Sequence, residues 1–183
     1  MVKKDLEEEL EIPGGVKVET EGRKIKVSGE KGEVSRKFRS PRISVLVENN
    51  KIKISAKNAT KREKALLNSY KAHLKNMING VLEGYIYKLK VCSGHFPMNV
   101  SFNNGVFEIK NFYGEKIPRK VELDPSVKVK IDGNNIILEG VSKEVVGQAA
   151  ANIEQATRRP GYDKRIFQDG IFIFEKAGKK LVE

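Results

Sequence analysis

The sequence contains no tryptophan and only one cysteine, Cys92, among its 183 residues. A single cysteine cannot form a disulfide within the chain, which agrees with a reducing compartment, and we expect the protein to be cytoplasmic. Without tryptophan, the hydrophobic cores depend on valine, isoleucine, leucine and eight phenylalanines. This length suits one large domain or two small ones.

Long hydrophobic runs are absent as well. No stretch approaches the ~20 apolar residues that a helix needs to cross a bilayer. Residues 1–11 hold five acidic and two basic side chains, unlike the basic start of a secretory or mitochondrial signal. We therefore expect no membrane segment and no leader, and the sequence leaves open whether this acidic start is ordered.

Residues that commonly carry catalysis or bind metals are scarce, since the chain has only two histidines. His73 lies beside the apolar stripe of a predicted helix and fits a packing role better than that of a base. His95 follows Cys92 by three residues, but this pair cannot supply the four ligands of a structural zinc site. Asp163 and Asp169 fit turns better than a catalytic pair, and no glycine-rich phosphate-binding motif is present. We expect no enzymatic activity, cofactor, metal or small-molecule substrate.

Positive charge is abundant, with 35 basic and 24 acidic residues and a net charge of +11. Such an excess predicts attraction to polyanions; nucleic acid is the commonest, and an anionic membrane surface is the second candidate. Residues 12–83 hold 17 basic and 7 acidic side chains, residues 84–157 hold 9 and 8, and residues 158–183 hold 7 and 4.

The sequence repeats itself at an offset of 82 residues, and residues of like character recur at this spacing. The matched pairs are Val16 and Met98, Val18 and Val100, Ile25 and Phe107, Val27 and Ile109, Gly32 and Gly114, Glu33 and Glu115, Val45 and Val127, Val47 and Val129, and Thr60 and Ser142. We interpret this pattern as a duplication of one structural unit.

Each copy shows period-two alternation of apolar residues, as in residues 25–27 and 127–131, which is typical of half-buried strands. Turns rich in Asn and Gly, such as residues 103–105, indicate antiparallel hairpins. One predicted helix follows in each copy. The first has a capping box formed by Thr60 and Glu63. Its stripe comprises Leu66, Tyr70, Leu74, Met77, Ile78 and Val81, and Asn79-Gly80 is its expected end; in the second helix, Ser142 is the cap and Val146, Ala149, Ile153 and Ala156 face inward.

These patterns predict an α+β protein of two tandem duplicated domains, each an antiparallel β-sheet packed against one α-helix. The first domain covers residues 1–83 and the second covers residues 84–157. Pro160 ends the second helix, so residues 158–183 are expected to leave the domain as an extended basic arm that packs on the second domain.

Two basic clusters are candidates for nucleic-acid contacts, although many charge runs are only solvated faces. One comprises Arg36, Lys37, Arg39 and Arg42. In the arm, arginines that suit phosphates and bases alternate with aromatic side chains. The arm's basic residues are Arg158, Arg159, Lys164, Arg165, Lys176, Lys179 and Lys180, and its aromatic residues include Tyr162 and Phe167.

Three sequence blocks resemble the ribosomal protein L-six family of the large subunit, in its archaeal and eukaryotic branch. They are residues 165–176 (RIFQDGIFIFEK), 95–100 (HFPMNV) and 111–116 (NFYGEK), and the resemblance spans roughly residues 10–178. It implies a structural protein that binds large-subunit ribosomal RNA near the sarcin–ricin loop and the stalk base, beside neighbouring ribosomal proteins and the region where translation factors act.

By position, the resemblance also implies contacts for the arm. These are Arg158, Arg159, Tyr162, Lys164, Arg165, Phe167 and Lys176, with Lys179 and Lys180 outside the motif. Secondary phosphate contacts are Arg36, Lys37, Arg39, Arg42, His95, Lys116 and Arg119. Phe167 either stacks on a base or anchors the arm, and we favour anchoring. A free-standing RNA- or DNA-binding module is the alternative function, and it would not co-sediment with the large subunit.

Overall fold

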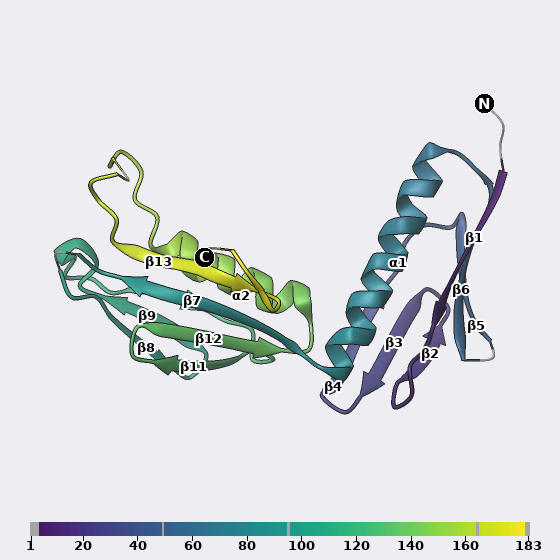
Figure 1. Cartoon of the computed structure of the whole chain (residues 1–183), viewed down its shortest axis with the longest axis horizontal. Coiled ribbons are helices and arrows are strands. Elements are labelled where there is room, and N and C mark those ends of the chain that lie inside the picture. The colour runs from purple at the N-terminus through teal and green to yellow at the C-terminus, as the bar shows by residue number, and fades with distance from the viewer. Residues whose placement is uncertain (1–3, 49, 95, 164, 182–183) are drawn as a thin grey trace. The chain divides into compact units, whose positions relative to one another are not determined.

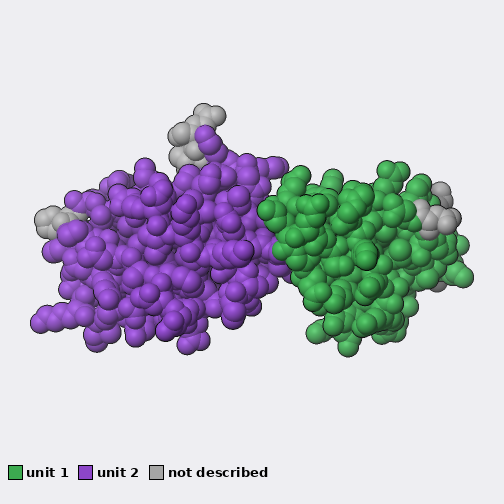
Figure 2. All heavy atoms as spheres, turned by 90° about the horizontal axis from the view of Figure 1, so that it is seen from below, with its two compact units in different colours: residues 1–84 green, residues 85–183 purple. Residues whose placement is uncertain are grey.

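The computed structural model describes residues 4–48, 50–94, 96–163 and 165–181 (Figure 1). The chain divides into two compact units, residues 1–84 and 85–183, which Figure 2 colours separately. No helix among the described residues is long and apolar enough to span a membrane.

The first unit contains six strands followed by one helix. The strands are β1 (Lys4–Glu11), β2 (Lys17–Glu21), β3 (Lys24–Gly29), β4 (Gly32–Lys37), β5 (Ile43–Glu48) and β6 (Lys51–Ala59), and the helix is α1 (Lys61–Leu82). They form two antiparallel sheets, with the orders β1-β6-β5 and β2-β3-β4.

The second unit repeats this order and then adds a hairpin. Its elements are β7 (Tyr85–Cys92), β8 (Asn99–Asn103), β9 (Val106–Lys110), the short 3-10 helix η1 (Phe112–Gly114), β10 (Arg119–Glu122), β11 (Lys128–Asp132), β12 (Asn135–Gly140), α2 (Lys143–Ala156), β13 (Gly170–Lys176) and β14 (Lys179–Lys180). Its sheets have the orders β11-β12-β7-β13-β14 and β10-β9-β8.

The duplication and the α+β class are confirmed. The two helices begin 82 residues apart, at Lys61 and Lys143, and β1 pairs with β6 as β7 pairs with β12. Each repeat contains two sheets, whereas the sequence pattern indicated one. The match of Gly32-Glu33 with Gly114-Glu115 is wrong, because Gly32 begins β4 while Gly114 ends η1.

Left-handed backbone conformations explain this break in the repeat. Asn111, Tyr113 and Gly114 have φ values of 60°, 49° and 74°, so the chain makes a tight turn after β9. The third strand of the second repeat, β10, therefore starts only at Arg119.

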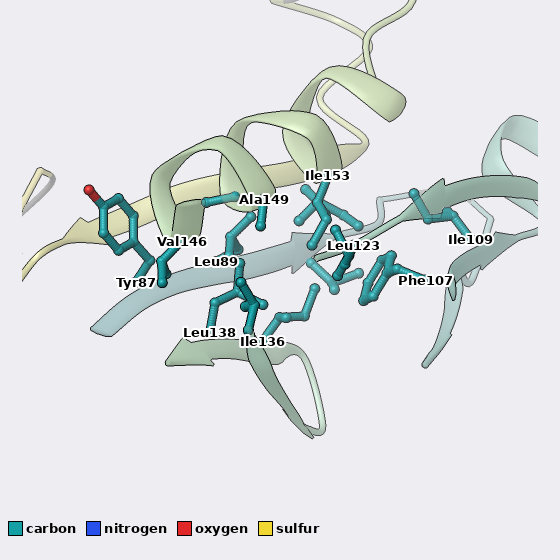
Figure 3. Close-up of a cluster of buried hydrophobic side chains, with 14 of the residues drawn as sticks. Tyr87, Leu89, Phe107, Ile109, Leu123, Ile136, Leu138, Val146, Ala149 and Ile153 are labelled. Carbon is teal, nitrogen blue, oxygen red and sulfur yellow. The ribbon is translucent and has the colours of Figure 1, made fainter. Parts of the chain in front are cut away.

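The core of the second unit lies between α2 and both sheets (Figure 3). Leu89, Ile136 and Leu138 of the five-stranded sheet and Ile153 of α2 are fully buried, and Phe107 and Ile109 come from β9. The small side chains on α2 allow close packing, as the sequence predicted: Ala149 and Ala150 are buried. Ala156, expected to face inward, is half-buried.

Helix α1 begins as predicted, but its stripe and its end differ from expectation. Thr60 and Glu63 form the capping box. Leu67 is buried and Leu66 only partly so. The expected end at Asn79-Gly80 is wrong, since the helix continues to Leu82.

Tertiary contacts carry the helix past these two weak helix formers. Val81 is fully buried, and its carbonyl oxygen accepts a hydrogen bond of 3.0 Å from the Lys31 amide. A Cβ atom on Gly29 would lie 3.0 Å from the same oxygen, so β3 approaches the last turn closely.

Glu63 combines three interactions at the start of α1. Its carboxylate accepts hydrogen bonds from the Thr60 amide at 3.0 Å and from the Thr60 hydroxyl, and it pairs with Arg42 at 2.9 Å. The hydrogen bonds from Thr60, with a smaller contribution from Arg42, lower the pKa of Glu63 from 4.5 to about 2.

Replacing Gly140 should destabilise the second unit, because a Cβ atom there would lie 2.6 Å from Cγ2 of the buried Val146. We expect Gly140→Ala to lower the free energy of unfolding by ~1–3 kcal/mol, measured by urea denaturation. Gly14→Ala is the control, because its Cβ atom would meet no atom within 4 Å. Equal stability of the two variants would contradict this packing.

The capping box should stabilise the first unit in a pH-dependent way. Because the folded pKa of Glu63 is about 2 against an ordinary 4.5, the contribution is complete above pH 4.5 and is lost as the pH falls through 2. We expect the stability deficit of Glu63→Gln to shrink over this window in urea denaturation. In a Thr60→Ala background, which lacks the hydroxyl but keeps the amide, the pH dependence of the same substitution should be weaker; an unchanged dependence would exclude the Thr60 hydroxyl as its cause.

Candidate nucleic-acid interface

The C-terminal residues form a loop and a hairpin. Residues 170–180 pack on the second unit, as expected, but as strands of its sheet and not as an arm that leaves the domain. Strand β13 pairs antiparallel with β7, with Ile171 opposite Val91. Ile171 is fully buried against the core. Residues 158–169, which we call the arch loop, connect the end of α2 to the start of β13 (Figure 1).

Hydrogen bonds hold both ends of the arch loop. The buried Thr157 hydroxyl accepts from the Ile171 amide at 3.0 Å and donates to the Glu154 carbonyl at 3.0 Å. At the far end, the Asp169 carboxylate accepts from the Gly94 amide. The loop therefore begins and ends at fixed points of the domain.

A turn at Asp163 shapes the tip of the loop. Its carboxylate accepts from the Arg165 amide at 2.9 Å and pairs with the Arg165 guanidinium at 2.8 Å. Its carbonyl accepts from the Phe167 amide at 2.8 Å. The sequence-based assignment of Asp163 as a turn residue is confirmed, and the Arg165 side chain stays 89% exposed.

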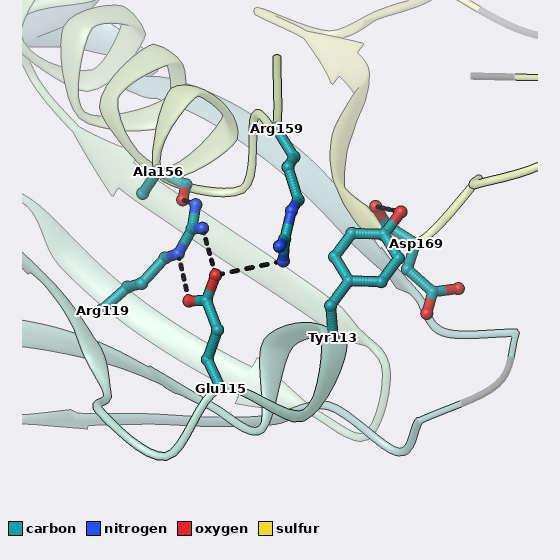
Figure 4. A network of polar contacts seen from close by, with 6 residues as sticks. All are labelled: Tyr113, Glu115, Arg119, Ala156, Arg159 and Asp169. Atoms are coloured by element: carbon teal, nitrogen blue, oxygen red, sulfur yellow. Dashed lines mark hydrogen bonds and ion pairs between the residues drawn. The ribbon is translucent and has the colours of Figure 1, made fainter. Parts of the chain in front are cut away.

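Two arginines share one carboxylate at the base of the loop (Figure 4). Arg119 makes a two-pronged ion pair with Glu115, with distances of 2.7 and 2.8 Å, and donates to the Ala156 carbonyl at the end of α2. Arg159 reaches the same carboxylate at 3.3 Å. Arg119 above all lowers the pKa of Glu115. Because two guanidinium groups face one carboxylate, the cluster keeps one positive charge.

Aromatic rings stack around Arg159. Its guanidinium lies 4.5 Å from the centre of the Tyr162 ring and 5.4 Å from that of Tyr113. Phe167 contacts both rings at 4.8 and 6.1 Å. The Tyr113 hydroxyl donates to the Asp169 carbonyl at 3.4 Å, and burial is the main cause that raises its pKa. Phe167 thus packs on rings of η1 and of the loop itself, and it does not belong to β13, which begins at Gly170; 43% of Phe167 stays exposed.

Several predicted contact residues are exposed around this frame. They are Arg158, Arg165, Lys176, Lys179, Lys180 and Lys116. Arg119 and Arg159 are only partly exposed and lie within the network above. Lys164 and His95 lie outside the described residues.

In the first unit, the predicted cluster surrounds a buried aromatic pair. Phe38 packs on Tyr70 at 4.4 Å, and the Tyr70 hydroxyl accepts from the Ser40 amide at 2.9 Å. Arg36 contacts His73 at 3.3 Å, so this histidine has a structural neighbour. Arg42 pairs with Glu63, and Lys37 and Arg39 are exposed.

A cavity of about 690 Å³ lies beneath the arch loop. Of its lining residues, the sequence predicted only Arg158, Arg159, Tyr162 and Phe167 as contacts, and Cys92 and Phe172 are among those that it missed. Alternation in β13 could have found Phe172, because Ile171 and Ile173 face the core and the residue between them must face away. The cavity is lined by Cys92, Tyr113, Glu154, Gln155, Thr157, Arg158, Arg159, Tyr162, Phe167, Gln168, Asp169 and Phe172. Among the described residues, no three His, Cys, Asp or Glu side chains gather as metal ligands.

Comparison with known proteins agrees with the resemblance inferred from the sequence. The sequence model of ribosomal protein L6 matches residues 12–84 and 96–170, one segment in each unit. The large ribosomal subunit protein uL6 of Methanococcus vannielii is 46% identical over 96% of this chain and 97% of its own length. The protein of the same name from Ignicoccus hospitalis is 45% identical over 91% and 92%. The chain therefore belongs to the ribosomal protein L6 family.

Proposed function

We propose that this protein is a structural constituent of the large ribosomal subunit in the cytoplasm and binds large-subunit ribosomal RNA through its second unit. The family consists of structural components of the ribosome, not enzymes, and the related proteins are named for the large subunit. The observation that carries the proposal is a set of exposed cations on a loop and a hairpin that the domain holds in place.

The exposed cations contribute affinity by neutralising phosphates and releasing counterions, which requires no particular base sequence. Selectivity then comes from the fixed spacing of these charges, which matches the shape of a folded RNA better than that of an arbitrary duplex. The proposed direct contacts are Arg158, Lys164, Arg165, Lys176, Lys179 and Lys180.

Arg159 and Arg119 contribute in a second way. Both are partly exposed, and the cluster of these two arginines and Glu115 carries one net positive charge. Their main effect is to hold the arch loop against η1 and the end of α2, so that Tyr162 and Phe167 stay at the surface.

The remaining basic residues form the proposed secondary phosphate contacts. They are Arg36, Lys37, Arg39, Arg42, His95 and Lys116. The resemblance favours a location near the sarcin–ricin loop and the stalk base, where the protein would support the factor-binding region beside neighbouring ribosomal proteins. A free-standing RNA-binding module is the alternative, and it would remain in the soluble fraction when ribosomal subunits are sedimented.

Deleting residues 158–183 would be a poor test, because it removes β13 and exposes the edge of β7. Replacing exposed basic residues by glutamine removes their charge and keeps the fold. We expect a slope of log K against log salt of about −5 for large-subunit RNA if about six phosphates are engaged. Replacing Arg158, Lys176, Lys179 and Lys180 by Gln should make this slope less steep by about 3, as measured by filter binding.

The matched control replaces four lysines of the same unit, Lys110, Lys120, Lys128 and Lys130, by Gln. Two of these pair with Glu108 at the surface, where ion pairs add little stability. The control lowers the net charge equally but should leave the slope nearly unchanged. The same slope in both variants would place the contacts elsewhere, and a wild-type protein without salt-sensitive retention on this RNA would refute the proposal.

Arg159→Lys separates positioning from charge. Lysine keeps the positive charge but lacks the planar guanidinium that stacks on Tyr162. We expect RNA affinity to fall roughly 2- to 10-fold with an unchanged salt slope. Arg23→Lys is the control, because this exposed arginine of the first unit is not among the proposed contacts, and the affinity of this variant should stay near wild type. Equal losses in the two variants would contradict a positioning role.

A further inference from the structure

We propose that the cavity beneath the arch loop, which we call the arch pocket, receives an unpaired base of the bound RNA. The inference rests on the proposed function and adds a subsite to it. In this subsite, Phe172 and the pocket wall near Cys92 contact the base. Neither residue belongs to the charged surface described above.

Half-exposed aromatic side chains surround this one cavity. Phe172, Tyr162 and Phe167 are 46%, 41% and 43% exposed. A Cβ atom on Gly170 would lie 3.1 Å from the Phe172 ring, so the glycine allows this ring to lie close to the backbone. Aromatic rings left open at a nucleic-acid surface are the usual platforms for base stacking, which every base can use.

Charge at the rim favours a nucleotide over an apolar peptide. Arg158 lines the pocket and is exposed, with no carboxylate partner among the described residues. Arg159 lies beside it, in the cluster with Glu115 that keeps one positive charge. A base with its phosphate can contact both the rings and the Arg158 guanidinium, whereas an apolar segment would leave Arg158 without a partner.

Polar side chains at the rim suit the edge of a base. The amides of Gln155 and Gln168 each offer donor and acceptor groups. Gln168 donates to the Arg165 carbonyl at 3.2 Å, which holds its side chain against the loop. Such groups can hydrogen-bond to a base only when its edge is not already paired within a duplex.

Contacts within the domain hold the walls of the pocket, so little ordering accompanies occupancy. Thr157 and Asp169 hold the two ends of the loop, and Arg159 holds Tyr162 from below. A fixed site loses less conformational entropy on binding than a loop that must fold around its ligand.

The first experiment compares two short RNA hairpins that differ only in one bulged adenine. The wild-type chain should bind the bulged hairpin more tightly by roughly 5- to 150-fold, the range expected from stacking one base. Phe172→Leu keeps an apolar side chain but removes the ring, and most of this preference should disappear. Phe174→Leu is the control on the same strand, because Phe174 does not line the pocket.

The second experiment uses the unmodified chain and therefore does not depend on how a variant folds. Cys92 is the only cysteine of the sequence and lines the pocket. At equal occupancy, the bulged hairpin should slow alkylation of Cys92 by iodoacetamide, and the fully paired hairpin should not. Mass spectrometry measures the modified fraction.

The outcomes separate this inference from the proposed function. Equal binding of both hairpins, or equal protection of Cys92 by both, would overturn the base pocket while salt-sensitive binding of ribosomal RNA stands. Loss of the preference in Phe174→Leu as well as in Phe172→Leu would also overturn it. If the wild-type chain bound none of these RNAs, the proposed function itself would fail.

Discussion

The pairing of β13 with β7 is the interaction on which the candidate site depends. It places Ile171 in the core and fixes the end of the arch loop, while α2 fixes the beginning. A basic segment without this anchor would lose much of its affinity to the entropy of ordering on RNA. The hairpin thus gives the basic side chains of the C-terminal segment a defined spacing. The ion pairs and stacked rings then position the arch loop between these two fixed ends.

Much of the fold was predictable because it depends on local rules. Alternation and helical spacing located the elements, and the capping box formed by Thr60 and Glu63 marked the start of α1. The errors arose where tertiary contacts override local preference. Asn79 and Gly80 are weak helix formers and favour an end to the helix. The helix nevertheless continues past them, because Val81 is buried and its carbonyl accepts a hydrogen bond from the Lys31 amide. The left-handed turn around Tyr113 left no periodic signal, and so the repeat was aligned wrongly there.

The sequence predicted which basic and aromatic residues belong to the candidate site, but not which of them hold the loop and which face solvent. Arg159 and Arg165 have the same chemistry and lie six positions apart. The first is stacked on Tyr162 and paired with Glu115, which lies 44 residues away in sequence, while the second pairs with nearby Asp163 at the surface. Such long-range partners decide whether an arginine holds the loop or faces solvent, and no local pattern reveals them. The arch pocket escaped prediction for the same reason, since three separate segments line it.

The same edge of the sheet is covered by a further strand in the second repeat and uncovered in the first, among the residues that the structure describes. In the second unit, β13 covers the edge of β7, whereas the equivalent strand β1 pairs only with β6 among the described residues. An open edge invites pairing with other chains, and charged side chains on it discourage such pairing. Strand β1 carries Asp5, Glu7, Glu8, Glu9 and Glu11. This accounts for an acidic strand in an otherwise basic unit. Net charge sets attraction at a distance and does not locate a site, and the proposed contact surface lies where an added strand holds the cations in place.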